Sequence, residues 1–235
     1  MLDPMVRKVV QSHFRVHDHS NYVTDFFNHI GMSPFIVHSG VLGPDKSPAS
    51  RYLAQYLFDH PELYREKIVC QMGCGSGVQA VLMAKYGAER VVATDILDRA
   101  IWNTLENSKL HKTHFNLEER KGDLFESVKG EEYFDLVVFN PPAYQGRPLS
   151  AEPISYALLD RGSLLRKFLL EAPAHLSPSG KVVMVYPNAA GRLNDPAEQA
   201  SNYGMQASTL MHIIDNEGDH SIYELRPKKN FKRLF

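Results

Sequence analysis

The sequence predicts an α/β fold built on a mainly parallel sheet. Three observations support this prediction. From Lys67 onward, short apolar runs alternate with helical stretches, which is the rhythm of strand-helix-strand units. A glycine-rich turn follows the first apolar run and leads into a helix. The last two apolar runs flank Asn216-Glu217-Gly218-Asp219, a tight-turn composition that predicts a terminal hairpin.

The individual elements follow from this pattern. Residues 1–62 are rich in histidine and aromatic side chains, and we expect them to form short helices that cap the main domain, residues 63–235. Within this segment, Ser47 or Ser50 is suited to begin a helix that ends near Pro61. Strands are predicted over residues 68–72, 90–94, 116–121, 134–139, 181–186, 207–215 and 221–226. Helices are predicted over residues 78–86, 98–110, 163–175 and 195–203.

Length and composition exclude several classes of protein. The 235 residues, 43% hydrophobic and 23% charged, suit one globular core with a short appendage. A formal net charge of -1 provides no field that attracts a polyanion, so nucleic acid is not expected as a partner. No apolar run approaches the ~20 residues of a bilayer span, and the first residues show no basic stretch followed by an apolar core. We therefore expect a cytoplasmic protein that does not enter a membrane.

The cysteine and histidine residues indicate neither a disulfide framework nor a metal site. Cys70 and Cys74 are the only cysteines, and both lie in or beside a predicted buried strand and its loop. His13, His17 and His19 are better explained as surface or lid residues than as ligands. We therefore assign no metal.

The turn after the first predicted strand carries the strongest signal for a ligand. Gly73, Gly75 and Gly77 lie two residues apart, which lets the backbone turn sharply and lets a ligand approach main-chain N–H groups without interference from Cβ atoms. This favours a nucleoside ligand, although a tight turn without a ligand is the alternative. The dinucleotide pattern would need a glycine where Val78 stands, so the dinucleotide interpretation weakens.

Acidic residues follow the next two predicted strands. Asp95 lies about 20 residues past the glycine turn, the separation at which a carboxylate accepts both ribose hydroxyls. The alternative is a helix cap, a role that Asp98 also suits. Asp123 can accept a hydrogen bond from an adenine amino group while Leu124 covers the ring. Ile96, next to Asp95, is expected to contribute to the same site.

A rigid polar turn follows the fourth predicted strand and reads Asn140-Pro141-Pro142-Ala143-Tyr144. The two prolines restrict the backbone, so the amide of Asn140 is held at the carboxyl edge of the sheet, where open α/β folds bind ligands. A purely structural turn is the alternative.

Together these motifs resemble those of class I S-adenosylmethionine (SAM) dependent methyltransferases, in the branch with an Asn-Pro-Pro-Tyr-type motif. The resemblance covers roughly residues 40 to 190. It implies a Rossmann-like fold whose seven-stranded sheet has an antiparallel last strand, with a short helical N-terminal lid. It also implies that the glycine turn passes under the methionine part of SAM, that Asn140 and the carbonyl of Pro141 grip an amide or amine nitrogen, and that Tyr144 stacks near the target.

Two positions depart from the family pattern. Gln71 stands where the family usually has an acidic residue, so the ammonium group of SAM would face a neutral amide instead of a carboxylate. Ala143 is inserted between the second proline and Tyr144, so the tyrosine is expected to point elsewhere.

Three hypotheses follow. The first is methyl transfer to nitrogen, and about 60 N-terminal residues for recognition favour a small-molecule acceptor over a protein side chain. The second is a cyclase, in which a neutral amine of SAM attacks its own γ-carbon to form azetidine-2-carboxylate and methylthioadenosine, as in cyclising enzymes that share this fold. The third is an RNA or DNA amino-methyltransferase, which rests on the basic residues between Arg226 and Arg233.

Overall fold

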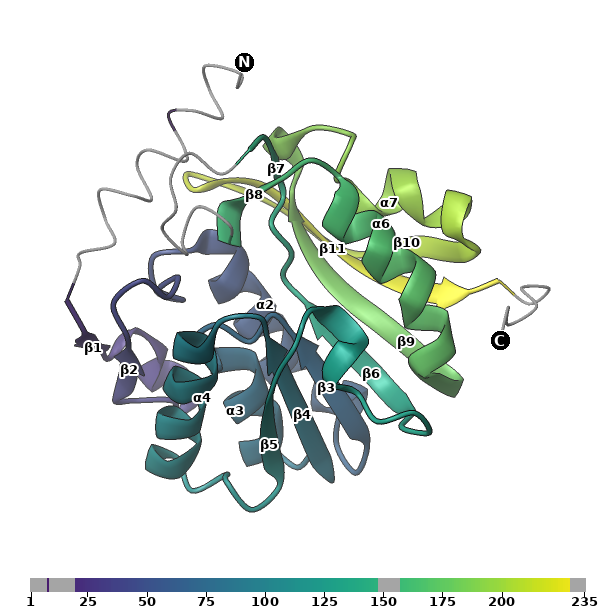
Figure 1. Cartoon of the computed structure of the whole chain (residues 1–235). Coiled ribbons are helices and arrows are strands. Elements are labelled where there is room, and N and C mark those ends of the chain that lie inside the picture. Colours follow the sequence, from purple (N-terminus) through teal and green to yellow (C-terminus); the bar gives the residue numbers. More distant parts are fainter. Residues whose placement is uncertain (1–7, 9–19, 148–156, 229–235) are drawn as a thin grey trace.

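A seven-stranded sheet forms the centre of the molecule in the computed structural model, which describes residue 8 and residues 20–147 and 157–228 (Figure 1). Its strands in chain order are β3 (Ile68–Met72), β4 (Arg90–Asp95), β5 (Leu117–Lys121), β6 (Phe134–Phe139), β9 (Leu176–Pro187), β10 (Met205–Asp215) and β11 (Gly218–Pro227). They are arranged β10-β11-β9-β6-β3-β4-β5. Strands β3, β4, β5, β6 and β9 run parallel, and β11 is antiparallel to both of its neighbours. The predicted α/β fold with an antiparallel last strand is confirmed.

The strand order reverses beside β3. After β3 the chain adds β4 and β5 on one side, and it then returns to add β6 and β9 on the other. In open α/β sheets, ligands bind in the crevice outside the carboxyl ends of the strands at such a reversal. This topology places any ligand site at the ends of β3, β4 and β6.

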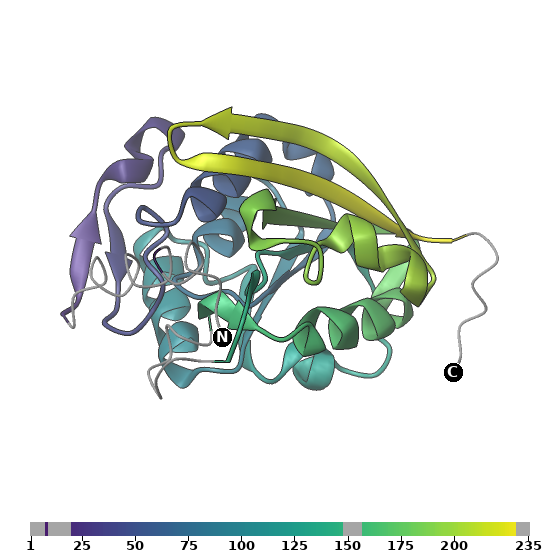
Figure 2. The ribbon, with the colours of Figure 1, turned by 90° about the horizontal axis from the view of Figure 1, so that it is seen from above.

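Helices cover both faces of the sheet. The main helices are α2 (Pro48–Asp59), α3 (Val78–Lys85), α4 (Asp98–Leu110) and α6 (Ser163–Glu171). Successive side chains in a strand point to opposite faces, so Val69 packs with α2 and α3 whereas Cys70 packs with α6. The last hairpin, β10 and β11, forms the long edge of the sheet in Figure 2.

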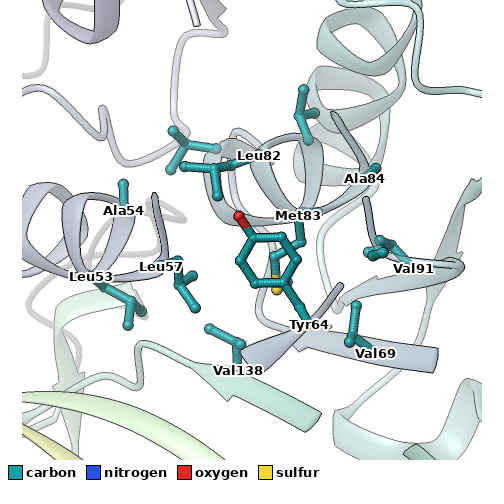
Figure 3. Close-up of a cluster of buried hydrophobic side chains, with 14 of the residues drawn as sticks. Leu53, Ala54, Leu57, Tyr64, Val69, Leu82, Met83, Ala84, Val91 and Val138 are labelled. Atoms are coloured by element: carbon teal, nitrogen blue, oxygen red, sulfur yellow. The ribbon is translucent and has the colours of Figure 1, made fainter. Parts of the chain in front are cut away.

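The core beneath α2 and α3 contains one unsatisfied polar group. Figure 3 shows Tyr64 among Leu57, Leu82 and Met83, with its hydroxyl pointing into the apolar cluster. The side chain of Tyr64 is fully buried, and its hydroxyl has no hydrogen-bond partner. Burial raises the pKa of Tyr64 to about 12. Such a group lowers stability relative to an apolar side chain of the same shape.

Two predicted helices are shorter than expected. The helix expected over residues 163–175 ends as α6 at Glu171 and continues as the 3₁₀-helix η4 (Ala172–His175), because Pro173 cannot donate a helical hydrogen bond. The helix expected over residues 195–203 is α7 (Pro196–Gln199), capped by Asp195, followed by η6 (Ala200–Tyr203). The N-cap of α2 is Ser47, whose side chain accepts a hydrogen bond from the N–H of Ser50.

The N-terminal segment contains strands as well as helix. β1 (Tyr22–Thr24) pairs with β2 (Phe35–Val37) across η1 (Phe26–Ile30), where short helices alone were expected. The reason is tertiary: Asn103 and Asn107 of α4 bond the backbone of Ile36, and Asn103 also accepts from the N–H of His38. Residues 13, 17 and 19 lie outside the described part of the chain.

The remaining short elements connect these units. They are η2 (Pro61–Leu63), η3 (Leu124–Ser127), β7 (Tyr144–Gln145), β8 (Leu159–Asp160) and η5 (Asn188–Ala190). Within residues 20–147 and 157–228, no helix has both the length and the apolar character needed to cross a bilayer.

Candidate active site

Two neighbouring cavities lie at the carboxyl edge of the parallel strands, the first at the ends of β3, β4 and β6 and the second at the ends of β6 and β9. The first has a volume of about 180 Å³, and the second about 190 Å³. They share Leu42, Asn140 and Ala157 as lining residues. Asn140 therefore lies on the boundary between the first cavity and the second cavity.

The glycine turn contributes two of its three glycines to the first cavity. Gly73 and Gly75 line it, whereas Gly77 does not. Gly77 has φ +86°, and a Cβ there would lie 2.8 Å from the side chain of Thr104. The Thr104 hydroxyl also donates to the carbonyl of Gly75 (3.2 Å). Gly77 thus allows α4 to pack closely under the turn, whereas Gly73 and Gly75 are the glycines of the turn that line the cavity.

Asp95 lies at the end of β4 and faces the first cavity. The N–H of Gly75 donates to Asp95 Oδ2 (3.0 Å), and the N–H of Leu97 donates to Oδ1 (3.0 Å). Burial raises the pKa of this carboxyl group, and the hydrogen bonds from Leu97 and Gly75 oppose that shift. Each carboxylate oxygen keeps a second lone pair, so Asp95 can hold the turn and accept from a diol at once.

Ile96, Asp123 and Leu124 also line the first cavity. Ile96 is 59% exposed, which is unusual for an isoleucine and leaves an apolar surface for a ligand. Leu124 has φ +53°, a conformation that non-glycine residues rarely adopt and that concentrates at functional sites. Asp123 Oδ2 accepts a hydrogen bond from Lys167 Nζ (2.7 Å), and Asp123 also forms a capping box with Glu126 at the start of η3.

Gln71 does not line either cavity, in contrast to its predicted place at the cofactor. Its side chain is buried: Oε1 accepts from the N–H of Ala80 (2.8 Å), and Nε2 donates to Gln79 Oε1 (2.8 Å). Both ends of this amide are used inside the protein. The cyclase hypothesis, in which Gln71 faces the amine of SAM, gains no support from this arrangement.

Asn140 directly follows β6. Its Nδ2 donates to the hydroxyl of Ser50 in α2 (3.0 Å). Pro142 lines the first cavity, whereas Pro141 lines the second. The turn thus alternates between the two cavities, with the Asn140 side chain at their junction.

Tyr144 lines the second cavity despite the inserted Ala143. Ala143 is buried and its carbonyl accepts from Asn194 Nδ2 (3.0 Å), which takes up the extra residue inside the protein. Burial raises the pKa of Tyr144, so its hydroxyl stays protonated at neutral pH. Tyr144 therefore shares a cavity with Asn140 and Pro141.

Several lining residues were missed from the sequence. Leu42 and Ser50 come from the N-terminal segment, and Gln79 comes from the buried face of α3. Asp219 and His220 of the last hairpin line the second cavity. No local sequence motif marks these positions as part of a site. Only the predicted helix start at Ser47 or Ser50 falls among them.

The residues of the first cavity fit a nucleoside that carries an amino acid. Asp95 supplies a carboxylate for a diol, and Ile96 and Leu124 supply apolar surface for a base. Gly73 has φ +62°, and a Cβ there would lie only 3.3 Å from the ring of Phe139, so this position of the cavity wall favours glycine. The carboxylate acceptor and the apolar surfaces suit SAM.

Comparison with known families agrees with this geometry. The model of the family described as methyltransferase small domain matches residues 33–196, which include the glycine turn, Asp95 and the Asn140 turn. The chain belongs to the methyltransferase small domain family. It is a SAM-dependent methyltransferase, and SAM is its cofactor.

The relatives of this methyltransferase include enzymes named for protein and RNA substrates. It is 30% identical over 156 residues to a putative protein N5-glutamine methyltransferase of Methanocaldococcus jannaschii, covering 56% of this chain and 76% of the relative. It is 35% identical over 127 residues to the release factor glutamine methyltransferase of Clostridium acetobutylicum, covering 52% of this chain and 42% of the relative. A ribosomal RNA small subunit methyltransferase C of Alcanivorax borkumensis is 30% identical over 117 residues, with 50% and 31% covered. The methyltransferase thus spans less than half of the last two relatives.

Solved structures share the fold of this methyltransferase. A T. thermophilus 16S rRNA N2 G1207 methyltransferase in complex with AdoMet and guanosine aligns with a TM-score of 0.64 at 21% identity, covering 83% of this chain and 47% of that chain. A ribosomal protein L11 methylase of Lactobacillus delbrueckii subsp. bulgaricus aligns with a TM-score of 0.56 at 21% identity, covering 76% and 78%.

These relatives correct the expectation about partners. A small-molecule acceptor was favoured and nucleic acid was not expected, whereas the relatives are named for glutamine, ribosomal protein or ribosomal RNA. The expectation was wrong because it weighed net charge and the length of the N-terminal segment. Neither quantity describes the local surface at which an acceptor binds.

Proposed function

We propose that this methyltransferase transfers the methyl group of SAM to the NH₂ nitrogen of a glutamine side chain in a protein. The observation that carries the proposal is the place of Asn140 on the boundary of the two cavities, with Pro141 in the second. In the proposal, the first cavity holds SAM and the second holds the acceptor amide. Residues between Gly40 and Ser50 wall both cavities, which supports a capping role for the N-terminal segment.

In the first cavity, we propose that Asp95 accepts the ribose hydroxyls and that Ile96 and Leu124 enclose the adenine, with Asp123 accepting from its amino group. Gly73 and Gly75 would pass under the methionine part, where neither residue places a Cβ atom. A pair of charge-assisted hydrogen bonds from the ribose diol would offset the cost of burying this carboxylate, the cost that its raised pKa reflects.

In the second cavity, Asn140 Oδ1 and the carbonyl of Pro141 would accept the two N–H bonds of the acceptor. SAM supplies an electrophilic methyl group on its sulfonium sulfur. The two acceptors direct the nitrogen toward this methyl group and increase electron density on it, and the apolar residues Leu42, Pro48 and Leu158 exclude water. The acceptor gains a methyl group, S-adenosylhomocysteine is released, and one proton passes from nitrogen to solvent.

The relatives support glutamine as the target, since two of them are named as glutamine methyltransferases. A second candidate is the exocyclic amino group of a nucleic-acid base. It presents the same planar NH₂ group, and it is supported by the ribosomal RNA relative and by the guanosine-bound structure with the same fold.

The experiment is transfer from SAM labelled with tritium in the methyl group. Purified release factor, ribosomal protein L11 and 16S ribosomal RNA are offered separately, with SAM alone and an Asn140→Ala variant as controls. The proposal expects label in a protein, released as methylamine on acid hydrolysis, as an N-methylated glutamine amide requires. Label in RNA alone would replace the proposal by the second candidate. Methylthioadenosine formed from SAM alone would overturn both.

A further inference from the structure

A buried relay of hydrogen bonds ends on the amide of Asn140. The N–H of Ala80 at the start of α3 donates to Gln71 Oε1 (2.8 Å), and Gln71 Nε2 donates to Gln79 Oε1 (2.8 Å). Gln79 Nε2 then donates to the carbonyl of Ser50 (3.1 Å), and the hydroxyl of Ser50 accepts from Asn140 Nδ2 (3.0 Å). The relay thus runs from under the glycine turn to the boundary of the two cavities.

The direction of the first three bonds is determined by their ends. A backbone N–H can only donate, so the N–H of Ala80 requires the side-chain oxygen of Gln71. The NH₂ group of Gln71 therefore points toward Gln79. A backbone carbonyl can only accept, so Ser50 requires the NH₂ group of Gln79. Gln71 and Gln79 are each 3% exposed, so water does not compete for these bonds. Both glutamine amides are therefore held in one orientation.

Both backbone groups of Ser50 make hydrogen bonds that hold the residue in place. Its carbonyl accepts from Gln79, and its N–H donates to the Ser47 cap (3.3 Å). The residue is 7% exposed, so its hydroxyl has a defined place. On the other side, Pro141 and Pro142 restrict the backbone after Asn140. The Asn140 amide lies between two fixed points.

We propose that Ser50 is a positioning residue that turns Asn140 Oδ1 toward the acceptor by binding Asn140 Nδ2. An amide offers an acceptor on one side and two donors on the other, and only the acceptor side can receive the N–H bonds of an NH₂ substrate. Ser50 occupies the donor side. The inference rests on the proposed function, in which Asn140 binds the acceptor nitrogen. It also gives Gln71 a role: this residue keeps the relay aligned without touching SAM.

The first test does not depend on the acceptor. Selective ¹⁵N-asparagine labelling, with Asn140→Ala to assign the signals, reports hydrogen exchange of the Asn140 side-chain NH₂. We expect slow exchange in the wild type and in Ser50→Thr, which keeps the hydroxyl. Exchange should be at least about fivefold faster in Ser50→Ala, the effect of losing roughly one hydrogen bond. Equal exchange in the wild type and Ser50→Ala would overturn the proposal.

The second test measures methyl transfer to whichever acceptor becomes labelled. Ser50→Ala should lower kcat about tenfold, with SAM affinity within about threefold of wild type, and Ser50→Thr should restore most of the rate. Gln55→Ala is the matched control, since it removes bonds to His29 and Asp59 on the same helix α2 and should leave kcat unchanged. Unchanged kcat in Ser50→Ala, or a fall in SAM affinity as large as the fall in kcat, would contradict the role.

The two tests separate the inference from the proposed function. If no acceptor is labelled, the proposed function fails while the exchange measurement still decides whether Ser50 orients Asn140. If transfer occurs but Ser50→Ala changes neither exchange nor kcat, the inference fails and the proposed function stands.

Discussion

The two cavities on either side of Asn140 are built in different ways. The first is lined mainly by strand ends and the turns that follow them, such as residues 72–76, 78–79, 94–97 and 122–124, and these lie inside the part of the chain that matches the family. The second collects residues from five separate places, and one of them, residues 217–220 at the tip of the last hairpin, lies beyond that match. Under the proposed function, the residues that hold SAM therefore lie within the family match, whereas part of the acceptor site lies outside it.

The hairpin tip is fastened to helix α2 by ion pairing and hydrogen bonding. Arg51 pairs with Glu217, and the hydroxyl of Tyr52 donates to Asp215. His220 is 6% exposed, and burial lowers its pKa, so it lines the second cavity as a neutral imidazole at neutral pH. The part of the second cavity's wall that the hairpin tip provides therefore depends on its contacts with helix α2.

Substitution of Asn140 should distinguish the functions of the two cavities most clearly. Asn140→Ala should reduce methyl transfer by about 10² to 10³, because it removes an acceptor aimed at the reacting nitrogen. SAM affinity, measured by calorimetry, should change little. Loss of SAM binding in proportion to activity would show that Asn140 serves the first cavity alone.

Asp95 should have the complementary effect. Asp95→Asn is expected to weaken SAM binding roughly 10- to 100-fold, because a neutral amide replaces a charged acceptor of hydrogen bonds from the ribose. The KM for the acceptor should remain near that of the wild type. A variant whose acceptor KM rises and whose SAM affinity is unchanged would remove the distinction between the cavities.

The same carboxyl group predicts a pH dependence. Burial raises the pKa of Asp95, so it takes up a proton at a higher pH than an ordinary aspartate would. SAM affinity should therefore weaken as pH falls from neutral through this raised pKa, since the protonated group accepts fewer hydrogen bonds. In Asp95→Asn this part of the pH dependence should disappear.

Substitution of Gly77 tests whether close packing of the glycine turn against α4 stabilises the fold. Gly77→Ala should lower the free energy of unfolding by about 1–3 kcal/mol, because φ is +86° and the new Cβ would meet Thr104. Denaturant unfolding measures this loss. Ser76 is a neighbouring position for comparison, and Ser76→Ala should cost less because Asn107 bonds the backbone carbonyl of Ser76, which this change retains.

The hairpin should affect only the second cavity. Glu217→Ala breaks the pair with Arg51 and should raise the acceptor KM roughly threefold, the size expected for a partly exposed ion pair, with SAM affinity unchanged. Steady-state kinetics with each substrate varied in turn distinguishes the two. Glu198→Ala, which breaks an exposed pair with Arg192, is the control and should change neither constant.

Tyr64 provides the smallest expected change and lies outside both cavities. Tyr64→Phe removes a buried hydroxyl without a partner, so the free energy of unfolding should rise by up to about 1 kcal/mol. Both kinetic constants should stay at their wild-type values. A clear loss of stability would mean that the hydroxyl has a partner in solution.

The contrast between the cavities also explains what the sequence could predict. Strands 68–72 and 134–139 and helix 98–110 were predicted to the residue, because their apolar periodicity is local. Asp95 was placed at the correct edge of the sheet, since its position follows from the end of a strand. The partners of Gln71 were not predictable, because this buried amide bonds Gln79 and Ala80 of α3, which only the tertiary fold brings beside it.

The same reasoning applies to the acceptor side. The family resemblance placed Tyr144 with Asn140 and Pro141, whereas the inserted Ala143, counted along the chain, argued that the tyrosine points elsewhere. In the structure, Asn194 takes up that residue, and 51 positions separate the two partners. His220 carries no motif and reaches the second cavity only because β11 pairs with β9, where His220 lies opposite Pro187. Such placements depend on tertiary contacts that no local pattern encodes.

The most direct test of this account is a crystal structure with S-adenosylhomocysteine bound. The account predicts that the ribose hydroxyls contact Asp95 in the first cavity and that the sulfur end points toward Asn140, with the second cavity open beyond it. A nucleoside bound in the second cavity, or a sulfur that points away from Asn140, would contradict it.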